Sequence, residues 1–205
     1  MADKTRLQLL KAAQETFAEF GLKGARIDTI AQRAGVNKQL VYHYFGNKDG
    51  LYSTVLEKVY SEIRERESEL KLSTLPVEEA MRSLIEFSYD YLRENPDFVR
   101  ILADENVHGG RHMQASETVQ ALNTPIITLI EETLVRGVDE GLFRKGVDPL
   151  HFYLSIAGMS FFYFANIHTI SRAFGRDFDT KDAMDERRAH IVDLALNGIR
   201  PRPVI

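Results

Sequence analysis

The chain has 205 residues, of which 44% are hydrophobic and 27% are charged. This size and composition suit one large or two small globular domains and exclude an intrinsically disordered chain. There is no cysteine, so disulfides, thiolate metal sites and cysteine nucleophiles are excluded. We expect a soluble, cytoplasmic protein with no membrane partner, because no signal-peptide pattern is present and the apolar segment 154–167 is shorter than about 18 residues.

The net charge of −4 is unevenly distributed along the chain. Residues 1–60 contain nine Lys and Arg against six Asp and Glu, whereas the remainder contains 17 against 24. A basic N-terminal segment joined to an acidic body is typical of a nucleic-acid-binding module fused to a second domain.

Apolar residues recur at three- and four-residue spacing along the chain, without the period of two that a strand needs. We therefore predict an all-α protein of about nine helices. These are expected at about 4–20, 27–34, 38–45, 48–72, 77–94, 97–107, 115–140, 148–173 and 180–198. Gly21, Gly35 and Gly46 are expected to end the first three helices. Pro125 is expected to kink or divide the helix at 115–140.

The helices at 27–34 and 38–45, braced by the longer first helix, have the layout of a helix-turn-helix. In this motif the second short helix enters the major groove, which is about 12 Å wide. Lys38 and Gln39 lie in its first turn and are long enough to reach base edges. Gln can form two hydrogen bonds with adenine, and Lys can donate to guanine. Ile30, Ala34, Val41 and Phe45 are expected to support this helix from behind.

A second group of side chains is suited to phosphate oxygens: Tyr42, His43, Tyr44 and Lys48. Lys48 also lies at a predicted helix N-terminus, where free amides and the helix dipole favour an anion. Tyr44 and Phe45 could instead be core residues. We favour the core for Phe45 and phosphate for Tyr42, and the two alternatives stay open for Tyr44.

The segment 24–52 resembles the signature of TetR-type transcriptional repressors. The pattern Ile-Ala-x-x-Ala-Gly-Val occurs at residues 30–36, and Tyr-x-x-Phe-x-x-Lys occurs at residues 42–48. The resemblance implies a DNA-contacting set of Arg26, Lys38, Gln39, Tyr42, His43, Tyr44 and Lys48, with Thr29 and Asn37 as further candidates. Two positions depart from the family pattern. Val41 stands where Leu is usual, and Arg26 stands where Thr or Ser often opens the first short helix; we interpret Arg26 as a phosphate or minor-groove contact.

The resemblance also implies an organisation and a function. Residues 1–62 would form the DNA-binding domain, with the helix-turn-helix motif at about 26–45, and residues 63–205 a helical domain for effector binding and dimerisation. The chain would be a ligand-responsive repressor that binds a palindromic double-stranded DNA operator as a homodimer, through the helices at 148–173 and 180–198. Its partner would be a small-molecule effector, with no cofactor or metal. Residues 197–203 resemble the subgroup that includes the pyrimidine-utilisation repressor.

Two groups of residues are candidates for the effector pocket. Aromatic residues with nearby polar groups are common in ligand sites, and the helix at 148–173 supplies Phe161, Phe164, Asn166 and His168. The second group consists of Asp104, Glu105 and His108. The aromatic residues could instead be core. A metal site that includes His112 is disfavoured, because glycines 109 and 110 break the helical spacing of the histidines.

Two other classes of protein were weighed against a regulator. An all-helical hydrolase would use Asp104, Glu105 and His108, but no nucleophile–base arrangement and no phosphate-binding glycine loop is present. A module whose helix-turn-helix binds a protein would leave no protected half-sites on DNA. The sequence does not specify the operator, the effector, the regulated genes, repression against activation, or whether two dimers bind one operator.

Overall fold

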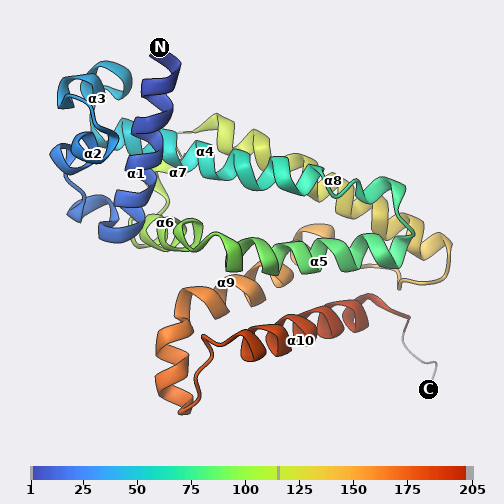
Figure 1. Ribbon diagram of the computed structural model, residues 1–205. Helices are drawn as coiled ribbons and strands as arrows, with labels where there is room; N and C mark the ends of the chain where they lie inside the picture. The colour runs from blue at the N-terminus through green and yellow to red at the C-terminus, as the bar shows by residue number, and fades with distance from the viewer. Residues whose placement is uncertain (1, 115, 202–205) are drawn as a thin grey trace. The chain divides into compact units, whose positions relative to one another are not determined.

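The computed structural model describes residues 2–114 and 116–201, and all the regular elements within them are helices (Figure 1). This confirms the predicted all-α class. The elements are α1 (Ala2–Gly24), α2 (Ile27–Ala34), α3 (Lys38–Phe45), α4 (Lys48–Ser68), the 3-10 helix η1 (Leu72–Thr74), α5 (Val77–Glu94), α6 (Pro96–Val107), α7 (Arg111–Gln114), α8 (Glu117–Asp139), α9 (Pro149–Phe174) and α10 (Lys181–Ile199).

Most helix bounds follow the sequence pattern, and α2, α3 and α5 have the predicted ends. The short helix α7 was not predicted. The expectation that Pro125 divides its helix is wrong, because α8 continues through it. Proline removes one backbone donor but its fixed φ is compatible with a helix. Residues 202–203, part of the C-terminal subgroup resemblance, lie outside the described residues.

The helices form two compact units, which are described separately. Unit 1 contains the chain up to Ile63 together with Asn95–Leu122, and unit 2 contains Arg64–Glu94 and the chain from Asn123 onward. The predicted domain boundary at 62–63 lies beside the end of the first segment. The segment 95–122, which the resemblance assigns to the second domain, packs with the N-terminal helices in unit 1.

An interruption in α1 explains why α6 belongs to unit 1. Gly21 has φ 65° and ψ 173°, and the amide of Leu22 beyond it donates to Asp104 Oδ2 of α6 at 2.8 Å. A Cβ at position 21 would lie 2.7 Å from Asp104 Oδ1, so glycine is required for both the backbone conformation and the close approach. The hydroxyl of Tyr52 on α4 donates to the same carboxylate at 3.2 Å. One half-buried carboxylate thus joins three helices.

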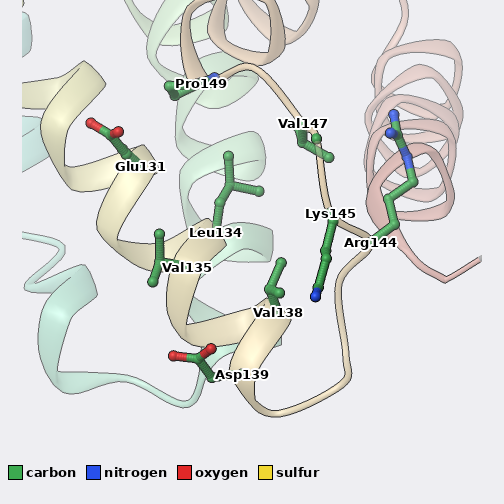
Figure 2. A pocket seen from close by; sticks show the side chains of 10 residues that line it. Glu131, Leu134, Val135, Val138, Asp139, Arg144, Lys145, Val147 and Pro149 are labelled. Atoms are coloured by element: carbon green, nitrogen blue, oxygen red, sulfur yellow. The ribbon is translucent and has the colours of Figure 1, made fainter.

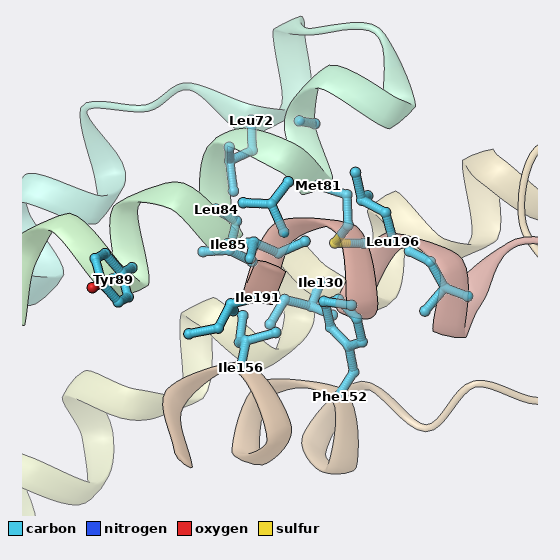
Figure 3. Packing of buried hydrophobic residues seen from close by; sticks show 14 of the residues in the cluster. Leu72, Met81, Leu84, Ile85, Tyr89, Ile130, Phe152, Ile156, Ile191 and Leu196 are labelled. Atoms are coloured by element: carbon cyan, nitrogen blue, oxygen red, sulfur yellow. The ribbon is translucent and has the colours of Figure 1, made fainter. Parts of the chain in front are cut away.

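The core of unit 2 is formed by α5, α8, α9 and α10, whose apolar side chains converge in Figure 3. Leu84 and Ile85 of α5, Ile130 of α8, Ile156 of α9 and Ile191 of α10 are each at most 1% exposed. Complete burial of such a side chain contributes roughly 1.5–3 kcal/mol. This shared core holds the four helices in one unit.

The helix α9 is poorly covered for so apolar a segment. It has 26 residues, and its most apolar window has a mean hydropathy of 1.2 but is only 28% buried. By length and composition alone, α9 is the one helix in residues 2–114 and 116–201 that could cross a membrane. Leu154 and Phe162 on its surface are 54% and 57% exposed. Unit 2 therefore carries an uncovered apolar helix face.

Candidate nucleic-acid interface

The two short helices α2 and α3 pack through a small buried face. Ile30 and Val41 are fully buried, which confirms them as supports of the motif. Ala34 and Phe45 are only half-buried, so the expectation that Phe45 is a core residue is wrong. The Phe45 ring lies at the end of α3, where the guanidinium of Arg6 is 5.7 Å from its centroid. The guanidinium thus partly covers the face of this half-buried ring.

The first turn of α3 is exposed and held by a cap. The side chain of Asn37 accepts the amide of Gln39 at 2.9 Å, as its position before the helix predicts. Lys38 and Gln39 point away from the packed face and are exposed. The Lys38 ammonium lies 3.1 Å from Asp28 Oδ1, and both side chains are more than half exposed. Because such a pair contributes only about 0–1 kcal/mol, a base acceptor can replace Asp28.

The start of α2 has no side-chain cap. Arg26 occupies the N-cap position in an extended conformation and makes no capping hydrogen bond. Ser or Thr at this position would occupy one of the first free amides. Thr29 lies half-buried in the same turn. An uncapped helix N-terminus beside an exposed guanidinium is a favourable place for a phosphate, in agreement with the interpretation of Arg26.

The aromatic residues of α3 occupy different environments. Tyr42 is 50% exposed and His43 is exposed, whereas Tyr44 is half-buried. The His43 and Tyr44 rings pack edge to face with centroids 5.2 Å apart. Tyr42 and His43 therefore have free access to solvent, while the question of core or phosphate for Tyr44 stays open.

The structure gives Lys48 a contact that the sequence pattern did not predict. Its ammonium donates to the backbone carbonyl of Ala25 at 3.1 Å, which joins the start of α4 to the end of α1. The first turn of α4 also approaches α3 closely, since a Cβ on Gly50 would lie 2.3 Å from the Phe45 carbonyl oxygen. An ammonium has three donors. Lys48 can hold this junction and still donate to a phosphate.

The polar half of the predicted effector pocket lies inside unit 1. Glu105 is fully buried, and its carboxylate accepts the backbone amide of His112 at 2.7 Å. Asp104 is occupied by the contacts at the break in α1, and His108 Nδ1 bonds to the Asp104 backbone carbonyl at 2.7 Å. Both carboxylates thus already accept hydrogen bonds from backbone amides. They hold unit 1 together and do not line an open pocket.

The aromatic half of the predicted pocket lies on α9 in unit 2. Phe161 and Phe164 are half-buried, and the Phe164 ring packs 4.8 Å from that of Tyr89. The amide of Asn166 donates to a carbonyl of its own helix, and His168 lines an open depression of about 450 Å³ near the end of α9. Phe164 is therefore mainly a packing residue, and the seven predicted pocket residues are divided between the two units.

Two further depressions in unit 2 lie beside the loop between α8 and α9. Figure 2 shows the smaller one, of about 280 Å³, with Leu134 and Val138 of α8 opposite Val147 of the loop. The larger, of about 700 Å³, lies between α9 and α10, and its lining includes Met159 and Leu194. Both are open to the surface, and the larger one adjoins the uncovered face of α9.

A buried ion pair near the end of α4 was missed by the sequence analysis. The Arg64 and Glu67 side chains are 9% and 5% exposed and are joined by a 2.5 Å contact between Nη1 and Oε2. Arg64 Nη2 donates to the Tyr153 hydroxyl at 2.8 Å, but its buried Nε has no partner in the described residues. Burial raises the pKa of Glu67 to about 7, although the positive charge of Arg64 opposes this rise. The charged run at 62–69 gave no sign of which positions are buried.

Comparison with known proteins identifies the family. The family model described as bacterial regulatory proteins, tetR family, matches residues 9–55, and the tetracyclin repressor-like C-terminal domain matches residues 76–195. The HTH-type transcriptional repressor NicS of Pseudomonas putida is 38% identical over 199 residues, which cover 97% of this chain and 94% of NicS. The chain belongs to the TetR family. It is a DNA-binding transcriptional regulator.

Two more distant TetR-family proteins extend the comparison. The regulator RutR of Escherichia coli K12 is 26% identical over 196 residues, which cover 95% of this chain and 90% of RutR. The solved structure of FadR from Bacillus subtilis in complex with stearoyl-CoA has a TM-score of 0.67 at 17% identity, covering 95% of this chain and all of that chain. At this identity the second match supports the shared fold.

The cap at Asn37 generates a prediction that separates folding from DNA contact. Asn37→Ala should lower the free energy of unfolding by about 1 kcal/mol, because the amide of Gln39 loses its acceptor. Asn37→Ser should restore stability in urea denaturation, since Ser is an equivalent cap. If Asn37→Ser restores stability but not DNA affinity, then Asn37 also contacts DNA; if Asn37→Ala is as stable as the native chain, the cap is unimportant.

Proposed function

We propose that this TetR-family chain is a ligand-responsive repressor that binds a palindromic operator as a homodimer. The observation that carries the proposal is α3, whose first turn is capped, exposed and supported by the buried Ile30 and Val41. One short helix makes few base contacts, so two copies reading successive major grooves about 34–36 Å apart would supply affinity and specificity. We also propose that it acts in the cytoplasm.

Base reading by α3 is tested at Gln39. Operator DNA is first selected from a random pool with the purified protein. Gln39→Ala should then lose about 1–3 kcal/mol of discrimination at one base pair in each half-site, because that side chain is proposed to read a base edge. Fluorescence anisotropy with single-base operator variants measures it. Gln32→Ala, an exposed residue of α2, serves as the control. A uniform loss for all sequences would contradict base reading by Gln39.

The uncovered face of α9 supports dimerisation through α9 and α10. Leu150, Leu154 and Phe162 on α9 and Leu194 on α10 are 49%, 54%, 57% and 51% exposed. Apolar side chains grouped in this way mark an interaction surface. A second copy of the same face would cover them and the adjoining depression of about 700 Å³. Ile156 of the same helix, by contrast, is fully buried and belongs to the core of its own unit.

Phe162→Asp should convert the dimer to a monomer, because an ionised carboxylate cannot be buried without a partner. Operator affinity should fall by roughly 100-fold as the second half-site is lost. Light scattering during size-exclusion chromatography measures the mass. Val135→Asp is the matched control, since Val135 is 55% exposed on α8. A dimer that survives Phe162→Asp would show that the interface lies elsewhere.

For the effector we propose an organic anion that binds at Arg64. A buried guanidinium with an unpartnered Nε lacks a hydrogen-bond acceptor, and an unsatisfied buried donor costs about 1–3 kcal/mol. Glu67, the acid paired with Arg64, carries only part of a negative charge near neutral pH, because burial raises its pKa to about 7. A ligand carboxylate could therefore displace Glu67 and bind the guanidinium through two hydrogen bonds. Strongly shifted groups of this kind cluster at functional sites.

Small carboxylic acids, each paired with its own amide, test this site by thermal shift. Acids but not amides should stabilise the protein, and Arg64→Gln should abolish the effect. Glu67→Gln should strengthen acid binding, because the internal competitor loses its charge. Arg82→Gln, at an exposed arginine of α5, is the control. If the acids stabilise Arg64→Gln as strongly as the native chain, or the amides are equally effective, the anion site is not at Arg64.

We propose no catalytic activity and no cofactor. The curated relatives NicS and RutR are transcriptional regulators. The acids weighed for a hydrolase, Asp104 and Glu105, are bonded to backbone amides at 2.8 and 2.7 Å and have a structural explanation.

A further inference from the structure

The histidine of the short helix α7 lies between two carboxylates within unit 1. His112 Nδ1 is 2.8 Å from Glu105 Oε2, and its Nε2 is 3.1 Å from Asp49 Oδ1. The imidazole is 7% exposed and packs edge to face on the Tyr52 ring, with centroids 4.9 Å apart. Glu105 belongs to α6 and Asp49 to the first turn of α4. His112 therefore connects α6 and α7 to the turn that carries Lys48.

The number of protons on His112 decides whether both contacts are attractive. Ionised carboxylates only accept hydrogen bonds, and neutral imidazole has a single N–H. Imidazolium can donate to Glu105 and Asp49 at once. After loss of one proton, the remaining N–H would stay with the fully buried Glu105, because losing a hydrogen bond costs more at a buried carboxylate than at an exposed one. The contact with the exposed Asp49 is then lost and a lone pair faces its carboxylate.

Every element packed around His112 contributes charged or titratable groups. From α4 these are Lys48, Asp49 and Tyr52; from α6, Asp104, Glu105 and His108; and from α7, Arg111. The guanidinium of Arg111 is 3.5 Å from Asp49 and exposed, so solvent and salt screen it more than the buried imidazole. The principal cation facing Asp49 is thus the one on His112.

Asp49 itself stays ionised across the neutral range. Its hydrogen bond with His112 is the largest influence and lowers the pKa of the carboxyl below its ordinary value. Because this shift is downward from the acidic range in which carboxyls ordinarily titrate, Asp49 stays ionised at neutral pH.

We propose that protonated His112 is a positioning residue for DNA binding, which neutralises Asp49 and fixes the first turn of α4, so that operator affinity falls as His112 loses its proton. The proposal rests on the proposed function, since it takes the start of α4 to lie near a phosphate. Without the imidazolium, the exposed and screened Arg111 is the remaining partner of Asp49, whose negative charge then lies less compensated beside Lys48. A single charge at a helix end changes affinity by roughly two- to five-fold.

The experiment measures operator affinity by fluorescence anisotropy from pH 6 to 8.5 at constant ionic strength. All proteins carry His43→Gln, so that this exposed imidazole of α3, which is proposed to contact DNA, makes no contribution of its own. In this background affinity should fall roughly two- to five-fold as pH rises. Adding Asp49→Asn should make operator affinity independent of pH. Its level should equal or exceed that of the His43→Gln protein at pH 6. Adding Glu19→Gln, at an exposed acid paired with Arg33, should raise affinity without changing the slope.

Asp49→Asn is preferred to a substitution of His112 because it leaves the buried contact with Glu105 intact. A second readout uses the DNA-free protein: NMR titration of the His112 ring should show protonation at lower pH in Asp49→Asn than in the native chain. The proposal is overturned if the Asp49→Asn profile keeps its slope, or if the ring titration does not move. Failure to bind any selected DNA, with the ring shift still present, would instead overturn the proposed function.

Discussion

Two adjacent carboxylates on α6, Asp104 and Glu105, are the interactions on which unit 1 depends. A buried carboxylate is costly unless hydrogen bonds compensate for the lost water. Asp104 receives the amide that the break at Gly21 exposes, and Glu105 receives the amide and ring of His112. These bonds explain why the segment 95–122 forms one unit with the helix-turn-helix. They make α6 and α7 part of the scaffold that supports the DNA-binding face.

Acidic side chains near the proposed DNA-facing surface are paired with basic ones. Each of the two acids at the proposed DNA-facing surface, Asp28 and Asp49, is paired with a cation, Lys38 in the first case and His112 with Arg111 in the second. A carboxylate near DNA repels phosphate. Pairing removes most of this repulsion and also directs the cation. In the DNA-free protein, Asp28 and Asp49 therefore hold the paired cations near the proposed DNA-facing surface.

Two features of unit 2 are left unsatisfied by its own packing. The apolar face of α9 is uncovered, although its opposite side contributes to a close-packed core. The guanidinium of Arg64 is buried with a donor that has no acceptor among the described residues. A second copy of the chain would complete the first, and an anionic ligand would complete the second. The uncovered face of α9 and the buried donor of Arg64 are thus the two observations in unit 2 on which the proposed dimer and the proposed effector site depend.

The helices and the exposed face of α3 were largely predictable from the sequence. Helical periodicity, the glycines at 35 and 46 and the cap at Asn37 act over a few residues, so α2 and α3 have their predicted bounds. The residues on the outer side of α3 follow from the same periodicity. Burial at the edge of a helix is less local, which is why Phe45 was wrongly assigned to the core.

The sequence by itself thus determined the fold class, the family signature and the side chains exposed on α3. Only the tertiary structure decided that α6 and α7 join the N-terminal helices, that Asp104 and Glu105 are internal, and that Arg64 is buried. The physical reason is the range of the interactions. A helical pattern repeats every three or four residues, whereas the bond between Leu22 and Asp104 spans 82 positions, and no local pattern records which distant group satisfies a buried charge.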